Sequence, residues 1–180
     1  MADESTPIGT LRSLLRDVPD FPSPGIVYKD ITPLLGDPAG FALAVEEMAR
    51  PWSDGSVDVV VGIEARGFIL GAPVARALGV GFVPLRKEGK LPWETSSEAY
   101  GLEYGTDVLE LHIDAVLPEQ KVLVVDDVLA TGGTAAAAER LVSRVGASLV
   151  GFGFLLELAF LDGRSKLAGH RVESTIIEAD

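Results

Sequence analysis

The stretch of residues 121–134 constrains the fold of this chain more than any other part of the sequence. Residues 122–125 are apolar and mostly β-branched, a pattern typical of a strand that is buried on both faces of a parallel sheet. Asp126 and Asp127 follow this run directly, and a small, glycine-containing turn at residues 130–134 then leads into a run of helix-forming residues. The sequence therefore predicts a strand, an acidic pair, a turn and the N-terminus of a helix in immediate succession.

The turn and the acidic pair favour different chemical groups. Backbone N–H groups in a glycine-rich turn, together with the positive end of a helix dipole, favour an anion at residues 130–134. Asp126 and Asp127 repel an anion, but their oxygens suit hydroxyl groups or a divalent cation. A phosphorylated ribose presents both a phosphate and a diol, so it is the ligand that this pattern favours. The alternative is an ordinary strand, turn and helix in which both carboxylates are solvated or cap the turn.

Two common phosphate-binding motifs fit this sequence less well. A Walker loop needs a lysine after its last glycine, but Thr134 follows Gly133 here. A dinucleotide-binding fingerprint has the spacing G-x-G-x-x-G, and Leu156 stands where the third glycine would follow Gly151 and Gly153. Neither motif therefore explains the turn.

The string Val-Val-Asp-Asp-Val-Leu-Ala-Thr-Gly-Gly-Thr at residues 124–134 resembles the phosphoribosyl pyrophosphate (PRPP) signature of the type I phosphoribosyltransferases. Its second half is most similar to the members of that family that act on adenine. Four more blocks carry the same resemblance: residues 21–33 (FPSPGIVYKDITP), 64–68 (EARGF), 86–92 (RKEGKLP) and 102–105 (LEYG). The resemblance covers roughly residues 20–135 and includes the spacing between the blocks.

The resemblance implies an α/β protein with the type I phosphoribosyltransferase fold, in which helices flank a central, mainly parallel sheet. It implies a single domain over residues 1–180, with an N-terminal helix and a base-binding hood at about residues 1–35. A flexible lid is implied at about residues 90–105, where the chain is polar and punctuated by glycine. Such a lid would exclude water from a cationic sugar intermediate.

Local patterns agree with alternating helices and strands. The expected helices cover about residues 6–18, 38–49, 67–78, 135–145 and 160–167. The expected strands cover about residues 57–63, 81–85, 106–113, 122–125, 149–156 and 172–177. The first helix is predicted from Thr6 as its N-cap, from Pro7 at its first position, and from an apolar face that runs from Ile8 to Val18.

Composition and charge exclude several classes of protein. With 47% hydrophobic and 23% charged residues, the 180-residue chain is typical of one folded domain and not of a disordered protein. A net charge of −12 argues against nucleic-acid binding, and no apolar run approaches the roughly 20 residues of a membrane helix. The chain has no cysteine, and its N-terminus lacks the basic start and apolar core of a signal peptide. We therefore expect a cytoplasmic protein that binds neither nucleic acid nor membranes.

Charged residues follow two more predicted strands. Glu64 and Arg66 follow one of them, and three cations within residues 86–90 follow the next. Ligands of open α/β sheets bind outside the carboxyl ends of the strands, so both segments are candidates for an anion site. Surface ion pairs for the first segment, and a solvated loop for the second, are the alternatives.

The resemblance also implies roles for individual residues. The ribose and its phosphate are expected to contact Asp126, Asp127, Ala130, Thr131, Gly132, Gly133 and Thr134. Pyrophosphate is expected to contact Arg66, Arg86, Lys87 and Lys90. Adenine is expected to contact Val27, Tyr28, Lys29 and Val128, and Tyr104 belongs to the lid.

Ala130 and Glu103 together indicate the base. Relatives that act on 6-oxopurines carry an Asp-Thr-Gly turn whose aspartate meets the base nitrogen, and this chain has Ala130 at that position. The resemblance instead implies Glu103 of the Leu-Glu-Tyr-Gly block as the catalytic residue that takes the proton, delivered when the lid closes. The implied reaction transfers the 5-phosphoribosyl group of PRPP to adenine and gives AMP and pyrophosphate, a step of purine salvage. The alternatives are a phosphoribosyltransferase for another base such as xanthine, and a regulator that senses PRPP or nucleotides on the same fold.

The implied cofactor is Mg²⁺, held mainly by the substrate near Asp126 and Asp127, and no residue is assigned as its direct ligand. The family is usually homodimeric, so we expect a homodimer.

Overall fold

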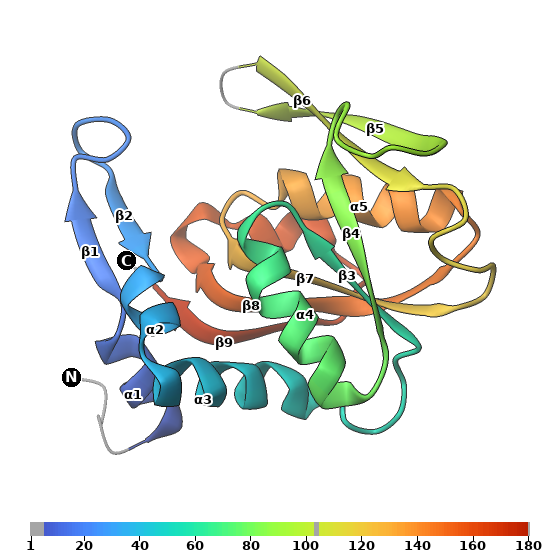
Figure 1. The fold of residues 1–180 in the computed structure, drawn as a ribbon. Coiled ribbons are helices and arrows are strands. Elements are labelled where there is room, and N and C mark those ends of the chain that lie inside the picture. Colours follow the sequence, from blue (N-terminus) through green and yellow to red (C-terminus); the bar gives the residue numbers. More distant parts are fainter. Residues whose placement is uncertain (1–5, 103–104, 180) are drawn as a thin grey trace. The chain divides into compact units, whose positions relative to one another are not determined.

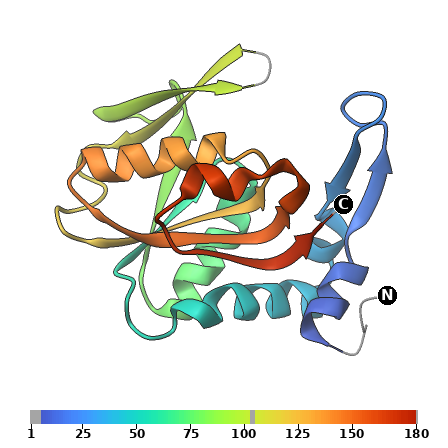
Figure 2. The ribbon, with the colours of Figure 1, turned by 180° about the vertical axis from the view of Figure 1, so that it is seen from behind.

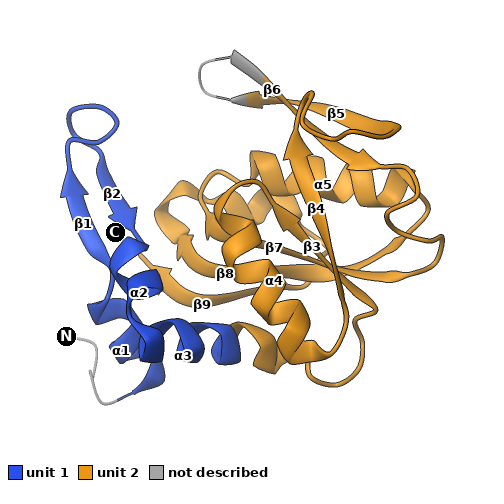
Figure 3. Ribbon diagram, in the orientation of Figure 1, with its two compact units in different colours: residues 1–47 blue, residues 48–180 orange. Residues whose placement is uncertain are grey.

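The computed structural model describes residues 6–102 and 105–179, which belong to two compact units, Met1–Glu47 and Met48–Asp180 (Figure 3). The first unit carries an N-terminal helix and a hairpin, and the second carries a large sheet. Across these described ranges, the helices are too short or too polar to cross a membrane.

The first unit holds a two-stranded sheet and three helices. Its elements are α1 (Pro7–Ser13), β1 (Arg16–Pro19), β2 (Val27–Asp30), α2 (Thr32–Gly36) and most of α3 (Pro38–Ala49). Thr6 caps α1 as predicted, because its hydroxyl accepts a hydrogen bond from the N–H of Gly9 at 3.0 Å. Pro7 follows as the first helical residue, where a missing N–H costs no helical hydrogen bond.

The predicted N-terminal helix is too long, because α1 ends at Ser13 and Val18 lies in strand β1. Pro19 disfavours the helical conformation at Val18, which precedes it. β1 pairs antiparallel with β2, and an ion pair between Arg16 and Asp30 at 2.8 Å supports the hairpin. Pairing with β2, which lies further along the chain, therefore overrides the helical periodicity of this segment.

The second unit is built on a seven-stranded sheet with the order β5-β6-β4-β3-β7-β8-β9. The strands are β3 (Val59–Ile63), β4 (Gly81–Lys87), β5 (Thr95–Leu102), β6 (Gly105–His112), β7 (Lys121–Leu129), β8 (Ser148–Leu158) and β9 (Val172–Glu178). Strands β4, β3, β7, β8 and β9 pair in parallel, whereas β5 and β6 form an antiparallel extension. The predicted α/β class with a mainly parallel sheet is confirmed.

Helices cover both faces of this sheet (Figures 1 and 2). Helix α4 (Arg66–Leu78) lies against β3 and β7 on one face, and α5 (Gly133–Arg144) and the 3-10 helix η3 (Gly163–Leu167) lie on the other. The predicted helix at residues 160–167 is two short 3-10 helices, η2 (Ala159–Leu161) and η3, and η1 (Arg50–Trp52) precedes β3. Every residue of β3 is buried, as expected of a central strand covered on both sides.

Strand β7 is longer than its apolar run predicts, because it continues past Val125 to Leu129. Asp126 and Asp127 therefore lie inside the strand and not after it. The pairing of β7 with β3 ends at Val125, whereas its pairing with β8 continues to Leu129. Backbone hydrogen bonds to a single neighbour are enough to extend the strand through the acidic pair.

The segment predicted as a long lid loop is largely β-structure, and the loop prediction is wrong for residues 95–102. They form β5, which pairs with β6 along its whole length. Glu98 on β5 forms ion pairs with Arg140 and Arg144 of α5. These long-range interactions outweigh the polar, glycine-containing composition of the segment. Glu103 and Tyr104 lie outside the described residues.

Candidate active site

A hollow lies where β7 leads into α5. It is lined by Asp126, Val128, Leu129, Ala130, Thr131, Gly132, Gly133, Thr134, Ala135 and Phe154. Gly132 is the N-cap of α5 and has a φ of 75°, in the left-handed region that favours glycine. The first turn of a helix leaves N–H groups without helical partners, and its dipole favours an anion there. The predicted phosphate-binding turn therefore lies at a concave surface with the right polarity.

Asp126 and Asp127 lie beside this hollow. Asp126 contributes to its lining, and the backbone N–H of Asp127 donates a hydrogen bond to Oδ1 of Asp126 at 2.9 Å. Burial and the neighbouring charge of Asp127 raise the pKa of Asp126 well above its usual range, although the guanidinium of Arg66 acts in the opposite direction. A carboxyl in this setting gains from any ligand that stabilises its ionised form, such as hydroxyl donors or a cation.

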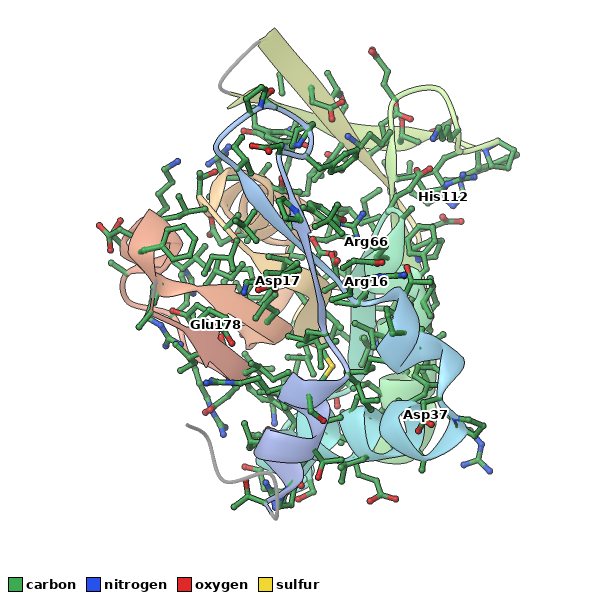
Figure 4. The ribbon with its side chains drawn as sticks, turned by 90° about the vertical axis from the view of Figure 1, so that its left-hand side faces the viewer. Arg16, Asp17, Asp37, Arg66, His112 and Glu178 are labelled. Carbon is green, nitrogen blue, oxygen red and sulfur yellow. The ribbon has the colours of Figure 1, made fainter. Side chains whose placement is uncertain are left out.

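Arg66, the first residue of α4, forms an ion pair between its Nε and Oδ2 of Asp127 (Arg66 is labelled in Figure 4). The side chain of Asp127 is 6% exposed and that of Arg66 is 47% exposed, so the pair lies at the boundary between core and solvent. Gly67 permits this approach, since a Cβ there would lie 2.8 Å from the carbonyl oxygen of Val125 and 2.9 Å from Oδ1 of Asp126. The structure thus joins two residues that the family resemblance assigned to different parts of the ligand, the pyrophosphate for Arg66 and the ribose phosphate for Asp127.

Glu64 holds the basic segment at the end of β4, a strand that runs to Lys87 and so extends two residues beyond its predicted end at residue 85. Its carboxylate accepts hydrogen bonds from Nζ of Lys90 at 2.5 Å, from the backbone N–H of Lys87 at 3.0 Å and from Nε of Arg86 at 3.3 Å. Burial raises the pKa of Glu64, but these three interactions outweigh it and hold that pKa at about 2. The predicted pyrophosphate-binding side chains of Arg86 and Lys90 therefore lie together around one carboxylate.

The side chain of Lys87, unlike its backbone, pairs with the carboxylate of Asp107 on β6. That carboxylate also accepts a hydrogen bond from the hydroxyl of Tyr100 at 3.1 Å. The bond between Lys87 and Asp107 lowers the pKa of Asp107 and raises that of Lys87. Sequence reasoning missed Asp107. The available signal was alternation along the strand, which places this acid on the same face as the buried Leu109 and Leu111.

The predicted adenine-binding residues of the N-terminal unit lie on β2. Tyr28 packs edge-to-face against Phe21 with ring centroids 5.2 Å apart. A hollow within this unit is lined by Val18, Phe21, Tyr28 and Asp30. Val27 is 49% exposed, and Lys29 forms an ion pair with Asp17 at 2.8 Å. Aromatic rings beside an exposed apolar side chain are suited to contact with a flat base.

The structure brings some of the predicted site residues together and leaves others apart. Val128 and the turn share one hollow, and Arg66 meets the acidic pair. Of the remaining cations, Arg86 and Lys87 are the last two residues of β4 and Lys90 follows that strand, which β3 separates from β7 in the sheet. The roles predicted for Glu103 and Tyr104 stay predictions, because both residues lie outside the described part of the chain. Within that part, no group of three or more His, Asp or Glu side chains is arranged to hold a metal ion by itself.

Comparison with known proteins gives matches along most of the chain. Residues 38–171 match the family described as the phosphoribosyl transferase domain. The chain is 59% identical to the adenine phosphoribosyltransferase of Acidothermus cellulolyticus over 162 residues, which is 90% of this chain and 92% of the relative. It is 57% identical to the adenine phosphoribosyltransferase of Myxococcus xanthus, over 96% of this chain and 94% of that relative.

Solved structures match the fold over nearly the same range. The crystal structure of adenine phosphoribosyltransferase from Rhodothermus marinus has a TM-score of 0.91 at 52% identity, and the match covers 97% of this chain and 99% of that one. The Saccharomyces cerevisiae adenine phosphoribosyltransferase, complexed with an imino-altritol bisphosphate and adenine, has a TM-score of 0.89 at 40% identity, covering 94% and 98%. The likeness thus extends across both compact units.

Proposed function

The chain belongs to the adenine phosphoribosyltransferase family, and we propose that it transfers the 5-phosphoribosyl group of PRPP to adenine at the carboxyl end of β7. The products are AMP and pyrophosphate. The observation that carries this assignment is one hollow that joins the acidic Asp126 to a glycine-containing helix start at residues 130–134. A phosphorylated ribose satisfies both halves of that hollow, because it carries hydroxyls and a phosphate.

Residues 130–134 hold the 5′-phosphate in this proposal. Their backbone N–H groups, the hydroxyls of Thr131 and Thr134 and the positive end of the α5 dipole supply hydrogen bonds and a favourable field. Asp126 and Asp127 bind the ribose hydroxyls, and their negative charge stabilises the cationic character of the sugar as the bond to pyrophosphate breaks. In this proposal, the negative charge of the two carboxylates lies beside the sugar, where positive charge develops during the reaction.

Arg66, Arg86, Lys87 and Lys90 hold the pyrophosphate. Each of these cations already meets a carboxylate of the protein, which is Asp127, Glu64 or Asp107. Pyrophosphate therefore replaces the protein carboxylates as the partner of these cations. The positions of the cations are already set before the ligand binds. Preorganisation of this kind lowers the entropy cost of binding.

Mg²⁺ is the proposed cofactor. The donors that this chain offers near the acidic pair are carboxylate oxygens, which suit this ion, and the described residues form no complete metal site of three or more ligands. In this proposal, substrate oxygens would hold most of the ion, near Asp126 and Asp127. The bound ion would neutralise charge on the leaving pyrophosphate.

Proton removal from adenine is assigned to Glu103, because Ala130 at the turn has no group that can accept a proton. Glu103 and Tyr104, which follow Leu102 in the sequence, are assigned to a lid that closes over the substrates. Adenine contacts Val27, Tyr28, Lys29 and Val128, of which the first three belong to the hood at about residues 1–35 of a single catalytic domain. We also propose a cytoplasmic homodimer.

Turnover with a panel of bases tests the assignment. The purified protein is incubated with PRPP, Mg²⁺ and one base at a time (adenine, hypoxanthine, guanine, xanthine or uracil), and nucleotide and pyrophosphate are quantified. We expect AMP and pyrophosphate from adenine and little product from the other bases. Faster turnover of xanthine would support an enzyme for another base, and tight PRPP binding without pyrophosphate release from any base would support a nucleotide-sensing regulator.

A further inference from the structure

The phosphate-binding turn rests on a second backbone segment, the start of η3. A Cβ added to Gly163 would overlap the carbonyl oxygen of Ala130 and lie 2.9 Å from the backbone nitrogen of Gly132. A Cβ added to Gly132 would in turn overlap the carbonyl oxygen of Gly163. Since real Cβ atoms essentially never come within 3.0 Å of such atoms, only glycines allow these two backbones to touch. We propose that Gly163 and Arg164 are positioning residues that hold the turn in the shape that binds the 5′-phosphate of PRPP, an inference that rests on the function proposed above.

The direction of the Ala130 carbonyl gives this contact a chemical meaning. Its oxygen lies against Gly163, so a partial negative charge that would repel a phosphate is directed at η3. The N–H groups of a tight turn are favourable to an anion only while neighbouring carbonyls point elsewhere. Displacement of the turn by a side chain at position 163 would therefore disturb the phosphate-binding geometry itself.

Arg164 fixes the adjoining residue of η3 to the sheet. Its Nε and Nη2 donate to the two carboxylate oxygens of Glu157 at 2.9 and 2.6 Å, and its Nη1 donates to the carbonyl oxygen of Val172 at 3.0 Å. This two-point geometry specifies direction as well as distance, which a single contact cannot do. The carboxylate is buried, since Glu157 is 5% exposed.

Glu157, which holds Arg164, lies beside the residue that precedes the turn. Glu157 on β8 is the register partner of Leu129, the last residue of β7, and Ala130 follows Leu129 directly. Strand pairing thus joins Leu129 to Glu157, and the ion pair joins Glu157 to Arg164. Gly163, next to Arg164, contacts Ala130, which follows Leu129 in the chain. The side chain of Leu167, at the far end of η3, is 2% exposed in the core of the sheet and ties down the other end (η3 lies beside α5 in Figure 2).

The ion pair also keeps its charge through the neutral range. Hydrogen bonding to Arg164 lowers the pKa of Glu157, and the same bond raises the pKa of Arg164. The contact between η3 and the turn is therefore expected to be insensitive to moderate changes of pH.

The first test is Gly163→Ala, with Gly81→Ala as the matched control. A Cβ at Gly81 would make only an ordinary contact of 3.9 Å with Val59, in the same unit and far from the turn in sequence. For Gly163→Ala we expect the KM for PRPP and the Kd for ribose 5-phosphate to rise about tenfold or more, because small misplacements of binding groups cost that much. The KM for adenine at saturating PRPP should stay within about twofold, since the change acts through the phosphate turn.

The second test guards against a glycine variant that fails to fold. Arg164→Lys keeps the charge but loses the two-point geometry, and we expect the Kd for ribose 5-phosphate to rise about threefold or more. Arg171→Lys is the control, because Arg171 pairs with Glu173 at 2.8 Å and bonds the carbonyl of Pro51 at 2.8 Å without contact to the turn. If Arg164→Lys lowers the melting temperature no more than its control does, a selective loss of ribose 5-phosphate binding supports positioning.

The outcomes separate this inference from the proposed function. Wild-type protein that makes no AMP from PRPP and adenine contradicts the function. Active wild-type protein, together with folded Gly163→Ala and Arg164→Lys variants that bind ribose 5-phosphate as their controls do, would overturn only the positioning role. Equal rises in the KM for PRPP and for adenine would also overturn it, because a general loss of stability has no preference for one substrate.

Discussion

Arg66 and Asp127 form an ion pair that joins the first residue of α4 to the carboxyl end of β7. The carboxylate is nearly buried and the guanidinium is half exposed, so the cation can still meet a ligand from the solvent side. The pair places the cation proposed to bind pyrophosphate beside the acids proposed to bind the ribose. Arg66 is therefore the residue that couples the pyrophosphate site to the ribose site of PRPP in our proposal.

Replacement of Arg66 by glutamine should weaken both catalysis and folding. The change leaves the buried carboxylate of Asp127 without its cation, and we expect the free energy of unfolding to fall by about 1–2 kcal/mol, a discounted value because Arg66 is half exposed. The kcat/KM for PRPP should fall about 100-fold, because charge on the leaving group is no longer neutralised. Arg140→Gln is the control, since Arg140 is similarly exposed and pairs with Glu98 on another part of the sheet. Steady-state kinetics and urea denaturation measure the two effects, and equal losses in both variants would contradict the role of Arg66.

Replacement of Asp126 by asparagine should stabilise the free protein while it impairs PRPP binding. The folded state raises the pKa of Asp126, so at neutral pH its ionised form is favoured less in the folded than in the unfolded chain. Asparagine carries no charge, and its amide oxygen can still accept the hydrogen bond from the N–H of Asp127. We expect the melting temperature to rise by about 2–4 °C and the kcat/KM for PRPP to fall about 100-fold.

Calorimetry and steady-state kinetics measure these opposite effects of Asp126→Asn. Asp114→Asn serves as the control, because Asp114 is exposed and lies outside the site. A variant that loses stability and keeps its affinity for PRPP would contradict the prediction.

Replacement of Glu64 by glutamine should change how stability depends on pH. The pKa of Glu64 is lowered from 4.5 to about 2, so its ionised form contributes stability fully above about pH 4.5. That contribution is lost as the pH falls towards 2, where the folded protein also becomes protonated at this site. The difference in the free energy of unfolding between wild type and Glu64→Gln should therefore be constant near neutrality and shrink in acid.

Guanidinium denaturation at a series of pH values measures that difference, with Glu88→Gln as the control at an exposed position of the same segment. A wild-type advantage that stays unchanged down to the acid limit would show that the lowered pKa of Glu64 does not contribute to stability.

Replacement of Glu103 by glutamine should reduce the chemical step and spare substrate binding. Loss of a general base typically costs about 100- to 10,000-fold in rate, so single-turnover formation of AMP should slow by that order. The Kd for PRPP, measured by calorimetry, should stay within about twofold because Glu103 is assigned to the base and not to the phosphates. Glu94→Gln is a matched control in the same lid segment. An unchanged single-turnover rate would remove Glu103 from this role.

Removal of divalent cations should abolish turnover reversibly. A chelator withdraws the ion that we propose to neutralise the leaving pyrophosphate, and Mg²⁺ added back should restore the rate in a saturable manner. The melting temperature of the ligand-free protein should not change, because the substrate supplies most of the ligands. Full turnover in the presence of chelator would contradict the assignment of Mg²⁺.

Elements with a strong local pattern could be predicted from the sequence. The apolar run before Asp126, the glycine turn at residues 130–134 and the helix that follows were predicted within a few residues, since their determinants lie next to one another. Strand β3 and helix α3 were predicted for the same reason. Val18 and the polar residues 95–102 were predicted wrongly, because strand partners elsewhere in the chain decide their conformation.

The partners of the charged residues could not be predicted at all. The sequence identified Arg86, Lys87 and Lys90 as one cation cluster, whereas the structure divides them between Glu64 and Asp107. Which carboxylate a cation meets depends on strand order and register, and these are set by contacts between distant segments. The pairing of β6 with its neighbours brings Asp107 to Lys87.

The sequence by itself determined the chemical groups of this protein: an acidic pair, an anion-binding turn, a set of cations and a turn without a proton acceptor. These depend on residue identity and short spacing, which the chain carries locally. The tertiary structure alone decided that Arg66 meets Asp127, that Glu64 pairs with two of the cations, and that Gly163 packs against the turn. Those relationships join residues far apart in the chain, and only a packed sheet with a defined strand order brings such residues within contact distance.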